Sequence, residues 1–386
     1  EMANLNAKIF AELNDQESLY FKVSGQIEDN QASLSSITPY TFNIDPLQNP
    51  FDADQFTMQR LGLDVIHKYV SPRGFNLKSK IYTSSFERDW WRQVTDVVRA
   101  QEVRSYLGED IFEDRYSYLQ NETPGNFDYV RVGRVINGPE STTDSRWAFS
   151  VFGLKETLTF DWQRGEYTHR GEVGFNTHFE TFSDRLLRAD SSRWARTGDI
   201  EKDLFYQVWA TNAYARLAFQ WGNFTLTPIY RLEHVQMFRQ DRKSASLNPN
   251  LGEAGGPKER NNYWISQPGI SLNYDFGNSE LYGSVYRGFI APSKVFGFLV
   301  ERNGVVVNPL EGESINIEPE ISTNAELGWK GELIPNRLSG QITGFQTQIE
   351  NFYAAGRNEV FEELGTIRTR GIELSLTTPL ISKQNH

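Results

Sequence analysis

The chain of 386 residues contains no cysteine. Disulfide bonds, zinc–thiolate sites and cysteine nucleophiles are therefore excluded together. The chain also lacks any run of about 18 or more apolar residues, which excludes a transmembrane helix. Its opening stretch EMANLNAKIF has neither the charged region nor the apolar core of a signal peptide, so none is expected within these residues.

Positive charge is scarce relative to negative charge. The formal net charge is -11 at pH 7, from 39 Lys and Arg against 50 Asp and Glu. Phosphate binding favours a basic surface, so no nucleic-acid partner is expected. The mean hydropathy is low, which is typical of soluble proteins. It is equally typical of transmembrane β-barrels, because barrel strands alternate apolar and polar residues.

Motifs for catalysis and for ligand binding are also lacking. The patterns G-x-S-x-G, S-x-x-K and H-E-x-x-H do not occur, so nucleophilic and zinc-protease chemistry is not expected. The glycine-rich stretch at residues 252–257 lacks the strand–helix context of a phosphate-binding loop, and the acidic stretches lack EF-hand spacing. We therefore expect a protein that is not an enzyme and that holds no cofactor or metal of its own.

What the sequence does contain is a two-residue alternation of apolar and polar positions. In residues 173–185, VGFNTHFETFSDR, the odd positions through 181 carry apolar residues and threonine, whereas Asn176, His178 and Glu180 occupy even positions. A strand sends successive side chains to opposite faces, so this pattern predicts a two-faced strand. The same alternation recurs at residues 59–70, 212–221, 324–333 and 368–376.

His178, Glu180 and Asp184 offer an alternative reading as metal ligands. A metal site needs three or four convergent ligands, and none of the five histidines pairs with another at ligand spacing. These three residues fit better as polar side chains on one face of a strand than as metal ligands. We therefore expect no metal here.

The connections between the predicted strands alternate between short turns and long loops. The short ones are 71–74, 221–223, 276–279 and 334–337, and the long ones are about 28–55, 86–126, 184–203, 237–262 and 290–320. Outer-membrane barrels have short turns at one end and long loops at the other. Aromatic residues near predicted strand ends suit an interfacial girdle: Tyr69, Phe75, Trp209, Trp221, Phe224, Tyr274, Phe276 and Trp329.

These patterns predict an all-β fold, a transmembrane antiparallel β-barrel with about 13 to 15 strands in this chain. The apolar face would contact lipid and the polar face would line an aqueous lumen. The residues predicted to face the lumen are Asn176, His178, Glu180, Arg231, Glu233, Glu326, Lys330 and Glu373. Alternatives are a passive porin-like channel, a soluble β-sandwich carbohydrate-binding module and, last, a glycosidase.

The stretch FERDWWRQVTDVVRAQ, residues 86–101, is the candidate for ligand contact and is expected to open a long loop. The candidate residues are Arg88, Asp89, Trp90, Trp91 and Arg92. Arginine and tryptophan are enriched among residues that anchor recognition, and the guanidinium matches carboxylate geometry. The alternative is an interfacial girdle followed by a solvated loop with a helical turn.

Several stretches, in order along most of the chain, resemble TonB-dependent outer-membrane receptors, and within them the ferric dicitrate receptor type. They are SLSSITPYTFNIDPLQNP, IYTSSFERDWWRQ, GEVGFNTHFE, NFTLTPIYRLEHV, NIEPEISTNAELGWKGEL and FQTQIENFY with GTIRTRGIELSL. The fifth stretch is the most specific. Two positions depart from the family pattern: Asn176 stands where arginine is usual, and Ile229 where glycine is usual.

The resemblance implies a segment of a 22-stranded barrel. The N-terminal plug domain, its TonB box and the closing strands have no counterpart, so a partial barrel over residues 1–386 is expected. The implied activity is energy-coupled uptake of a ferric chelate by a monomer in the bacterial outer membrane, with iron only as part of the cargo. The implied partners are TonB, through the plug, and the lipid bilayer with lipopolysaccharide.

The resemblance also bears on the ligand. Arg88 lies at or next to a position where the dicitrate receptor type binds its anionic ligand. A second expected arginine is missing from the stretch PGNFDY. The chelate could therefore be iron citrate or a siderophore. Because a partial barrel has two unpaired edges, the segment is not expected to form a stable channel alone.

Overall fold

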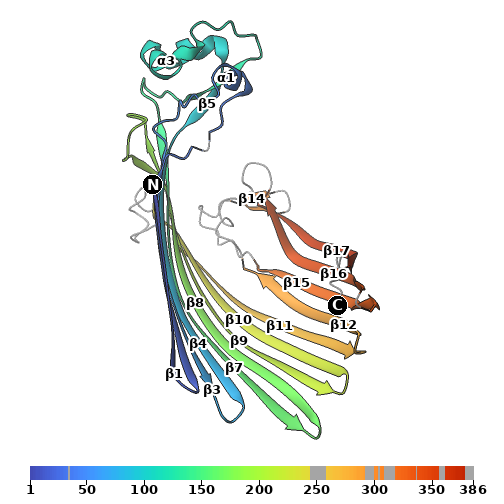
Figure 1. The fold of residues 1–386 in the computed structure, drawn as a ribbon. Helices are drawn as coiled ribbons and strands as arrows, with labels where there is room; N and C mark the ends of the chain where they lie inside the picture. The colour runs from blue at the N-terminus through green and yellow to red at the C-terminus, as the bar shows by residue number, and fades with distance from the viewer. Residues whose placement is uncertain are drawn as a thin grey trace, which may run out of the picture.

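The computed structural model of the chain describes residues 1–33, 35–243, 258–291, 300–302, 305–307, 318–335, 337–355 and 361–378. Fifteen strands form one sheet in the order β1-β2-β3-β4-β7-β8-β9-β10-β11-β12-β15-β16-β17-β13-β14 (Figure 1). Neighbours are antiparallel, except that β13 pairs with β17 in parallel. The predicted antiparallel β fold is confirmed. The sheet ends at β1 and β14 among the described residues, and the total of 22 strands stays a prediction.

Most strands are long enough to span a membrane, whereas β13 and β14 have three residues each. Their bounds are β1 (Met2–Asn14), β2 (Glu17–Asn30), β3 (Gln55–Val70), β4 (Phe75–Gln93), β7 (Thr142–Arg164), β8 (Tyr167–Ala189), β9 (Asp199–Trp221), β10 (Phe224–Asp241), β11 (Lys258–Asp275), β12 (Ser279–Ile290), β13 (Val300–Arg302), β14 (Val305–Val307), β15 (Glu320–Ile334), β16 (Leu338–Ala355) and β17 (Phe361–Thr377). No helix among the described residues is long and apolar enough to cross a membrane.

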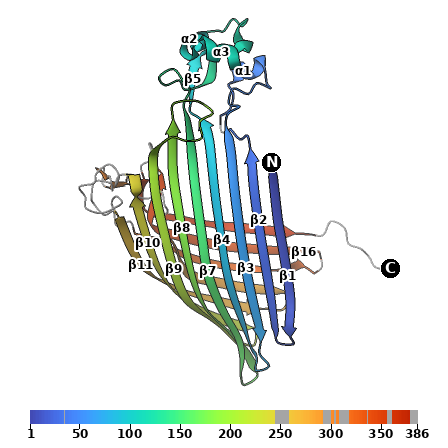
Figure 2. The ribbon, with the colours of Figure 1, turned by 90° about the vertical axis from the view of Figure 1, so that its left-hand side faces the viewer.

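The sheet curls, so that β12 and β15–β17 lie opposite the wall formed by β1–β9 (Figures 1 and 2). Val235, Tyr263 and Ile265 are each at most 8% exposed although the sheet is a single layer, because the sheet bends toward the side that carries them, which is the concave face. Paired residues on neighbouring strands lie on the same face, so the strand register shows which residues of β1–β9 share the concave face with Val235.

The alternation seen in the sequence separates the two faces. Away from the loop end, most convex side chains are apolar and open: Trp264 is 68% exposed and Ile372 is 76% exposed. Concave polar side chains crowd together because the sheet bends toward them, and Asn212 and Glu233 are each only 3% exposed. An open apolar face is costly in water, whereas lipid accommodates it.

Aromatic side chains border the convex apolar band. At the turn end, Trp162 and Phe219 lie with ring centroids 5.7 Å apart, and Trp221 stacks on Phe224 at 6.2 Å. Trp209 differs from the expected position, because it lies ten residues inside β9 and marks the opposite border. From Trp209 to Trp221 the strand covers about 40 Å, or about 28 Å vertically at a tilt of about 45°. That height matches the apolar band of outer-membrane barrels, about 25 Å.

Among the described residues, the short turns lie at one end of the wall and the long connections 31–54, 94–141 and 190–198 at the other (Figure 1). The expected loops at 237–262 and 290–320 lie largely outside the described residues. Gly222 has φ of +55° in the two-residue turn between β9 and β10, a conformation that residues with a Cβ rarely adopt. The expected loop at 86–126 is wrong at its start, since β4 continues to Gln93. The expected loop at 184–203 is shorter, because β8 continues to Ala189 and β9 begins at Asp199.

The long connections 31–54, 94–141 and 190–198 form a cap at the loop end (Figure 1). The cap contains α1 (Pro39–Ile44), β5 (Thr95–Arg99), η1 (Ala100–Glu102), α2 (Val103–Leu107), α3 (Glu109–Arg115), η2 (Ser117–Leu119) and β6 (Tyr129–Gly133), with β5 paired to β6. Its own core consists of Val103, Leu107, Phe112, Tyr116, Leu119, Val130 and Val132. The cap is therefore a folded unit with a hydrophobic core.

Candidate ligand-binding mouth

The last residues of β4 carry the predicted ligand contacts, and the strand divides them between two faces. By register, Arg88 lies opposite Trp147 on the concave face, and Trp90 and Arg92 share that face. Asp89 and Trp91 point to the convex face. The predicted cluster is therefore two groups with different surroundings.

The concave group forms an alternating stack of cations and rings, which we call the mouth ladder: Trp147, Arg88, Trp90 and Arg92. The Arg88 guanidinium lies 3.8 Å from the Trp147 ring centroid and 5.5 Å from that of Trp90. The Arg92 guanidinium lies 4.6 Å from the Trp90 centroid. Such cation–π contacts hold a guanidinium plane in place without neutralising its charge.

The mouth ladder retains unused donors. Nη2 of Arg88 donates to Oγ of Ser145 at 3.3 Å. The Nε atoms of Arg88 and Arg92 are buried and have no hydrogen-bond partner in the described part of the chain. A buried donor without a partner costs free energy, so these two guanidinium groups are not fully satisfied by the described residues.

Neighbouring segments fix both tryptophans. The Trp90 indole N–H donates to the carbonyl of Ala32 in the cap at 2.7 Å, and its backbone N–H donates to Oδ1 of Asp144 at 2.8 Å. The Trp147 indole N–H donates to Oδ1 of Asp184 at 3.0 Å. The ladder is therefore held rigidly where the wall meets the cap.

An aromatic floor continues from the ladder across β7, β8 and β9. Phe149 stacks on Phe182 with centroids 4.2 Å apart, and Phe182 stacks on Tyr206 at 5.7 Å. Leu204 completes this cluster, buried to 1% exposure. A surface with two guanidinium groups beside stacked rings is chemically suited to a flat or ring-containing anion.

The convex group serves the structure. Asp89 pairs with Nε of Arg146 at 2.6 Å. Trp91 is 4% exposed and lies 6.0 Å from the Arg196 guanidinium, whose Nη2 donates to the carbonyl of Ala53. These contacts fasten the cap to the strand end. Trp147 was missed in the sequence, since only the β4–β7 register brings it to Arg88.

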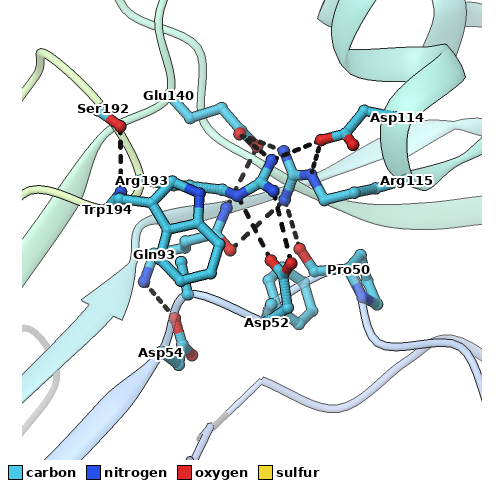
Figure 3. Close-up of polar contacts among 12 residues, drawn as sticks. Pro50, Asp52, Asp54, Gln93, Asp114, Arg115, Glu140, Ser192, Arg193 and Trp194 are labelled. Atoms are coloured by element: carbon cyan, nitrogen blue, oxygen red, sulfur yellow. Dashed lines mark hydrogen bonds and ion pairs between the residues drawn. The ribbon is translucent and has the colours of Figure 1, made fainter.

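A buried ionic cluster, the cap clamp, joins the three cap segments (Figure 3). Arg115 pairs with Glu140, and both side chains are 5% exposed. Arg193 pairs with Asp114 at 2.9 Å and with Asp52 at 3.3 Å. The Arg193 guanidinium lowers the pKa of the Asp114 carboxyl through its hydrogen bond. The clamp thus links residues far apart in sequence at the base of the cap.

A further carboxylate fixes the end of β4 to the cap. Oδ1 of Asp54 accepts the backbone N–H of Gln93 at 2.7 Å, and burial raises the pKa of Asp54. The Gln93 amide donates to Oε1 of Glu140 at 3.2 Å. Gly133 leaves room for this contact, because a Cβ there would lie 2.2 Å from Oε1 of Glu140.

The predicted lumen-facing residues all fall on the concave face by register: Asn176, His178, Glu180, Arg231, Glu233, Glu326, Lys330 and Glu373. His178 lies 2.9 Å from the Tyr82 hydroxyl and 3.4 Å from Oε2 of Glu180. Arg231 pairs with Glu233 at 2.6 Å.

The metal alternative finds no geometric support in the part of the chain that the structure describes. There, no group of three or more His, Cys, Asp or Glu side chains could hold a metal ion. Asp184 instead accepts from Trp147 at 3.0 Å and from Lys202 at 3.0 Å.

Known proteins resemble this chain in sequence. The family model "TonB dependent receptor-like, beta-barrel" matches residues 20–381. The ferric-pyoverdine 358 receptor of Pseudomonas putida is 22% identical over 373 residues, which cover 77% of this chain and 45% of that protein. The chain spans about half the length of the relatives it matches.

Solved structures share the fold. The ferric citrate transporter FecA in its unliganded form has a TM-score of 0.66 at 14% identity and covers 97% of this chain and 47% of its own. The ferric-catecholate import receptor Fiu of E. coli K12 has a TM-score of 0.64 at 14% identity, covering 98% of this chain and 55% of its own. With the family model matched over most of its residues, the chain belongs to the TonB-dependent receptor β-barrel family.

Proposed function

We propose that this chain forms the wall of an outer-membrane receptor that takes up a ferric chelate with energy supplied through TonB. The family supports the general activity, because the relatives described above are receptors or transporters of iron chelates. The mouth ladder supports the ligand class. Arg88 is held between the rings of Trp147 and Trp90, and Arg92 lies against the ring of Trp90; these two positive charges suit a ferric chelate bearing carboxylates or other anionic groups.

The proposal includes the surroundings of the receptor. The convex band between Trp209 and Trp221 fits a bacterial outer membrane, so lipid and lipopolysaccharide would contact that face of a monomeric receptor. TonB would act through the plug domain that the family resemblance implies. Iron would enter only as cargo. A ferric siderophore fits the ladder as well as ferric dicitrate, because both present anionic groups around a metal.

Uptake of radioactive iron tests the proposal. The full-length protein is produced in cells lacking their own ferric-chelate receptors, and ferric dicitrate, ferric pyoverdine and ferric catecholates are supplied in turn. We expect uptake of at least one chelate, and we expect Arg88→Ala to reduce it at least tenfold. Arg146→Ala is the matched control, because Arg146 lies on the convex face beside Asp89. Uptake that Arg88→Ala leaves unchanged would contradict the assigned mouth, and no uptake of any chelate would contradict the ligand class.

A further inference from the structure

A second group of cations lies on the concave face, nearer the turn end than the mouth ladder. It consists of Lys8, Lys22, Lys68, Lys78, Lys80 and Lys155, which we call the lysine field. These lysines come from the adjacent strands β1, β2, β3, β4 and β7 (Figure 2). Five strands at about 4.8 Å spacing give the field a width of about 19 Å.

The register sets these lysines directly against one another. Lys8 lies opposite Lys22, Lys68 opposite Lys78, and Lys80 opposite Lys155. Like charges at directly opposed positions destabilise a sheet. A chain with a net charge of -11 has abundant acidic residues, yet it places three such pairs together.

Counter-charges within the field are few. Nζ of Lys80 pairs with Oδ1 of Asp64 at 2.6 Å. The other five lysines make no ion pair with the residues that the structure describes. On β4 the acidic and basic residues lie on different faces: Glu87 and Asp89 are convex, whereas Lys78 and Lys80 are concave.

Outside the lysine field, no two cations occupy directly opposed positions among the described residues of the concave face. Lys330 pairs with Glu280 at 2.8 Å, and Arg231 pairs with Glu233 at 2.6 Å. The direct opposition of cations is therefore a property of the lysine field and not of the concave face as a whole. It points to a negative charge supplied from outside the described residues.

The position of the field identifies the partner it suits. Along β4 the concave face carries Arg92 and Arg88 in the mouth ladder and then Lys80 and Lys78 toward the turn end. An anion released from the ladder would meet these lysines next. Lysine is a flexible point charge and makes no bidentate fork, so the field suits weak and exchangeable binding of anions.

We propose that the lysine field is a second binding site, for a small polyanion bearing several carboxylates, which anionic cargo occupies after leaving the mouth ladder. The identity of the physiological cargo rests on the proposed function, but the binding of a polyanion does not. The field holds the anion through charge, without the aromatic contacts that fix it at the ladder. Its affinity therefore falls with ionic strength more steeply than that of the ladder.

Citrate is the probe, used on the full-length protein in detergent by isothermal titration calorimetry at low ionic strength. Triethyl citrate, which has the same skeleton without the charges, is the control ligand. The test variant is Lys78→Gln combined with Lys155→Gln, which removes one charge from each of two opposed pairs. The control variant is Lys330→Gln, which removes a concave lysine that has its own partner.

We expect citrate to bind the wild type, and the test variant to bind it at least tenfold more weakly, which corresponds to about 1.4 kcal/mol. The control variant should stay within about twofold, and triethyl citrate should not bind. Combining the test substitutions with Arg88→Ala separates the two sites, because the lysine-dependent loss should persist when the ladder is impaired.

Equal citrate affinity in the test variant and the wild type would overturn the proposal, and an acidic polypeptide segment would then be the partner of the field. An equal loss of citrate affinity in the control variant would also overturn the proposal, because the change in the net charge of the protein would then explain the loss. Iron uptake reports on the proposed function separately. A receptor that takes up no chelate but binds citrate through Lys78 and Lys155 would refute the proposed function and leave this inference standing.

Discussion

Replacing Glu140 with glutamine is expected to loosen the cap while leaving the membrane wall intact. Glutamine keeps the size of the side chain but removes the negative charge that pairs with Arg115 and lies 3.8 Å from Arg193 (Figure 3). Both guanidinium groups would then share only Asp52 and Asp114, which are more exposed than Glu140. A buried cation that loses its partner is not rehydrated, so the folded cap carries the cost.

The magnitude follows from burial. Arg115 and Glu140 are each 5% exposed, and removing one partner of such a pair costs about 3 to 5 kcal/mol. At about 3 kcal/mol, local opening of the cap becomes about 100-fold more frequent. Hydrogen exchange of the full-length protein in membranes measures this directly. Peptides covering residues 103–119 should exchange faster in the variant, whereas peptides from β8 and β9 should not change.

Glu113→Gln is the matched control, because Glu113 pairs with Arg104 at 3.3 Å on the surface, where both side chains are more than 40% exposed. Exposed pairs contribute about 0 to 1 kcal/mol, so exchange in the cap should stay close to wild type. Unchanged exchange at residues 103–119 in Glu140→Gln would refute the clamp. Equal acceleration across β8 and β9 would show that the cap and the wall unfold together.

Three other outcomes are expected. Gly153→Val should destabilise the wall by about 1 to 3 kcal/mol in a denaturant titration, because a Cβ at Gly153 would lie 2.1 Å from the ring of Tyr82; a neutral result would show that the ring moves away freely. Ile81→Arg on the convex face should cost about 2 to 4 kcal/mol in lipid vesicles, and Ser84→Arg on the concave face much less; equal costs would contradict the assignment of faces. The hydrogen bond from the Arg134 guanidinium lowers the pKa of Asp96. The stabilisation of the cap by Asp96 is therefore present above the unfolded pKa of about 3.9 and is lost as pH falls through the lower pKa of the folded state. Asp96→Asn should therefore weaken the acid dependence of hydrogen exchange in the cap, and an unchanged acid dependence would assign it to other carboxylates.

The sequence predicts the sheet well because alternation is a local property. Residues 173–185 already show which side chains share a face, and the register of β7, β8 and β9 confirms that sharing. The prediction of a loop at the end of β4 is wrong for a physical reason. Above the lipid both faces of a strand are wet, so Glu87 and Asp89 on one face and Arg88 on the other remove the alternation that marks a strand.

The site could be predicted only in part. Arg88, Trp90 and Arg92 were recognised from residue type, and the structure groups them on one face. Trp147 could not be assigned, because its contact with Arg88 depends on the register of two strands that the cap separates in sequence. The same holds for the clamp, whose residues come from three separate connections.

The central claim is that the concave face lines a water-filled path that a ferric chelate enters. The described wall offers a matched pair of probes in Ser84, which is concave, and Ser85, which is convex. Because these 386 residues contain no cysteine, Ser84→Cys or Ser85→Cys introduces the one thiol in this segment, and any cysteine elsewhere in the full-length protein is replaced by serine.

The deciding measurement is the rate at which a charged, water-soluble thiol reagent modifies each variant in intact outer membranes, with and without ferric dicitrate or ferric pyoverdine. The account predicts that Ser84→Cys reacts at least tenfold faster than Ser85→Cys and that at least one ferric chelate slows it. Equal rates, a faster reaction at Ser85→Cys, or a rate at Ser84→Cys that no ferric chelate changes would contradict the account.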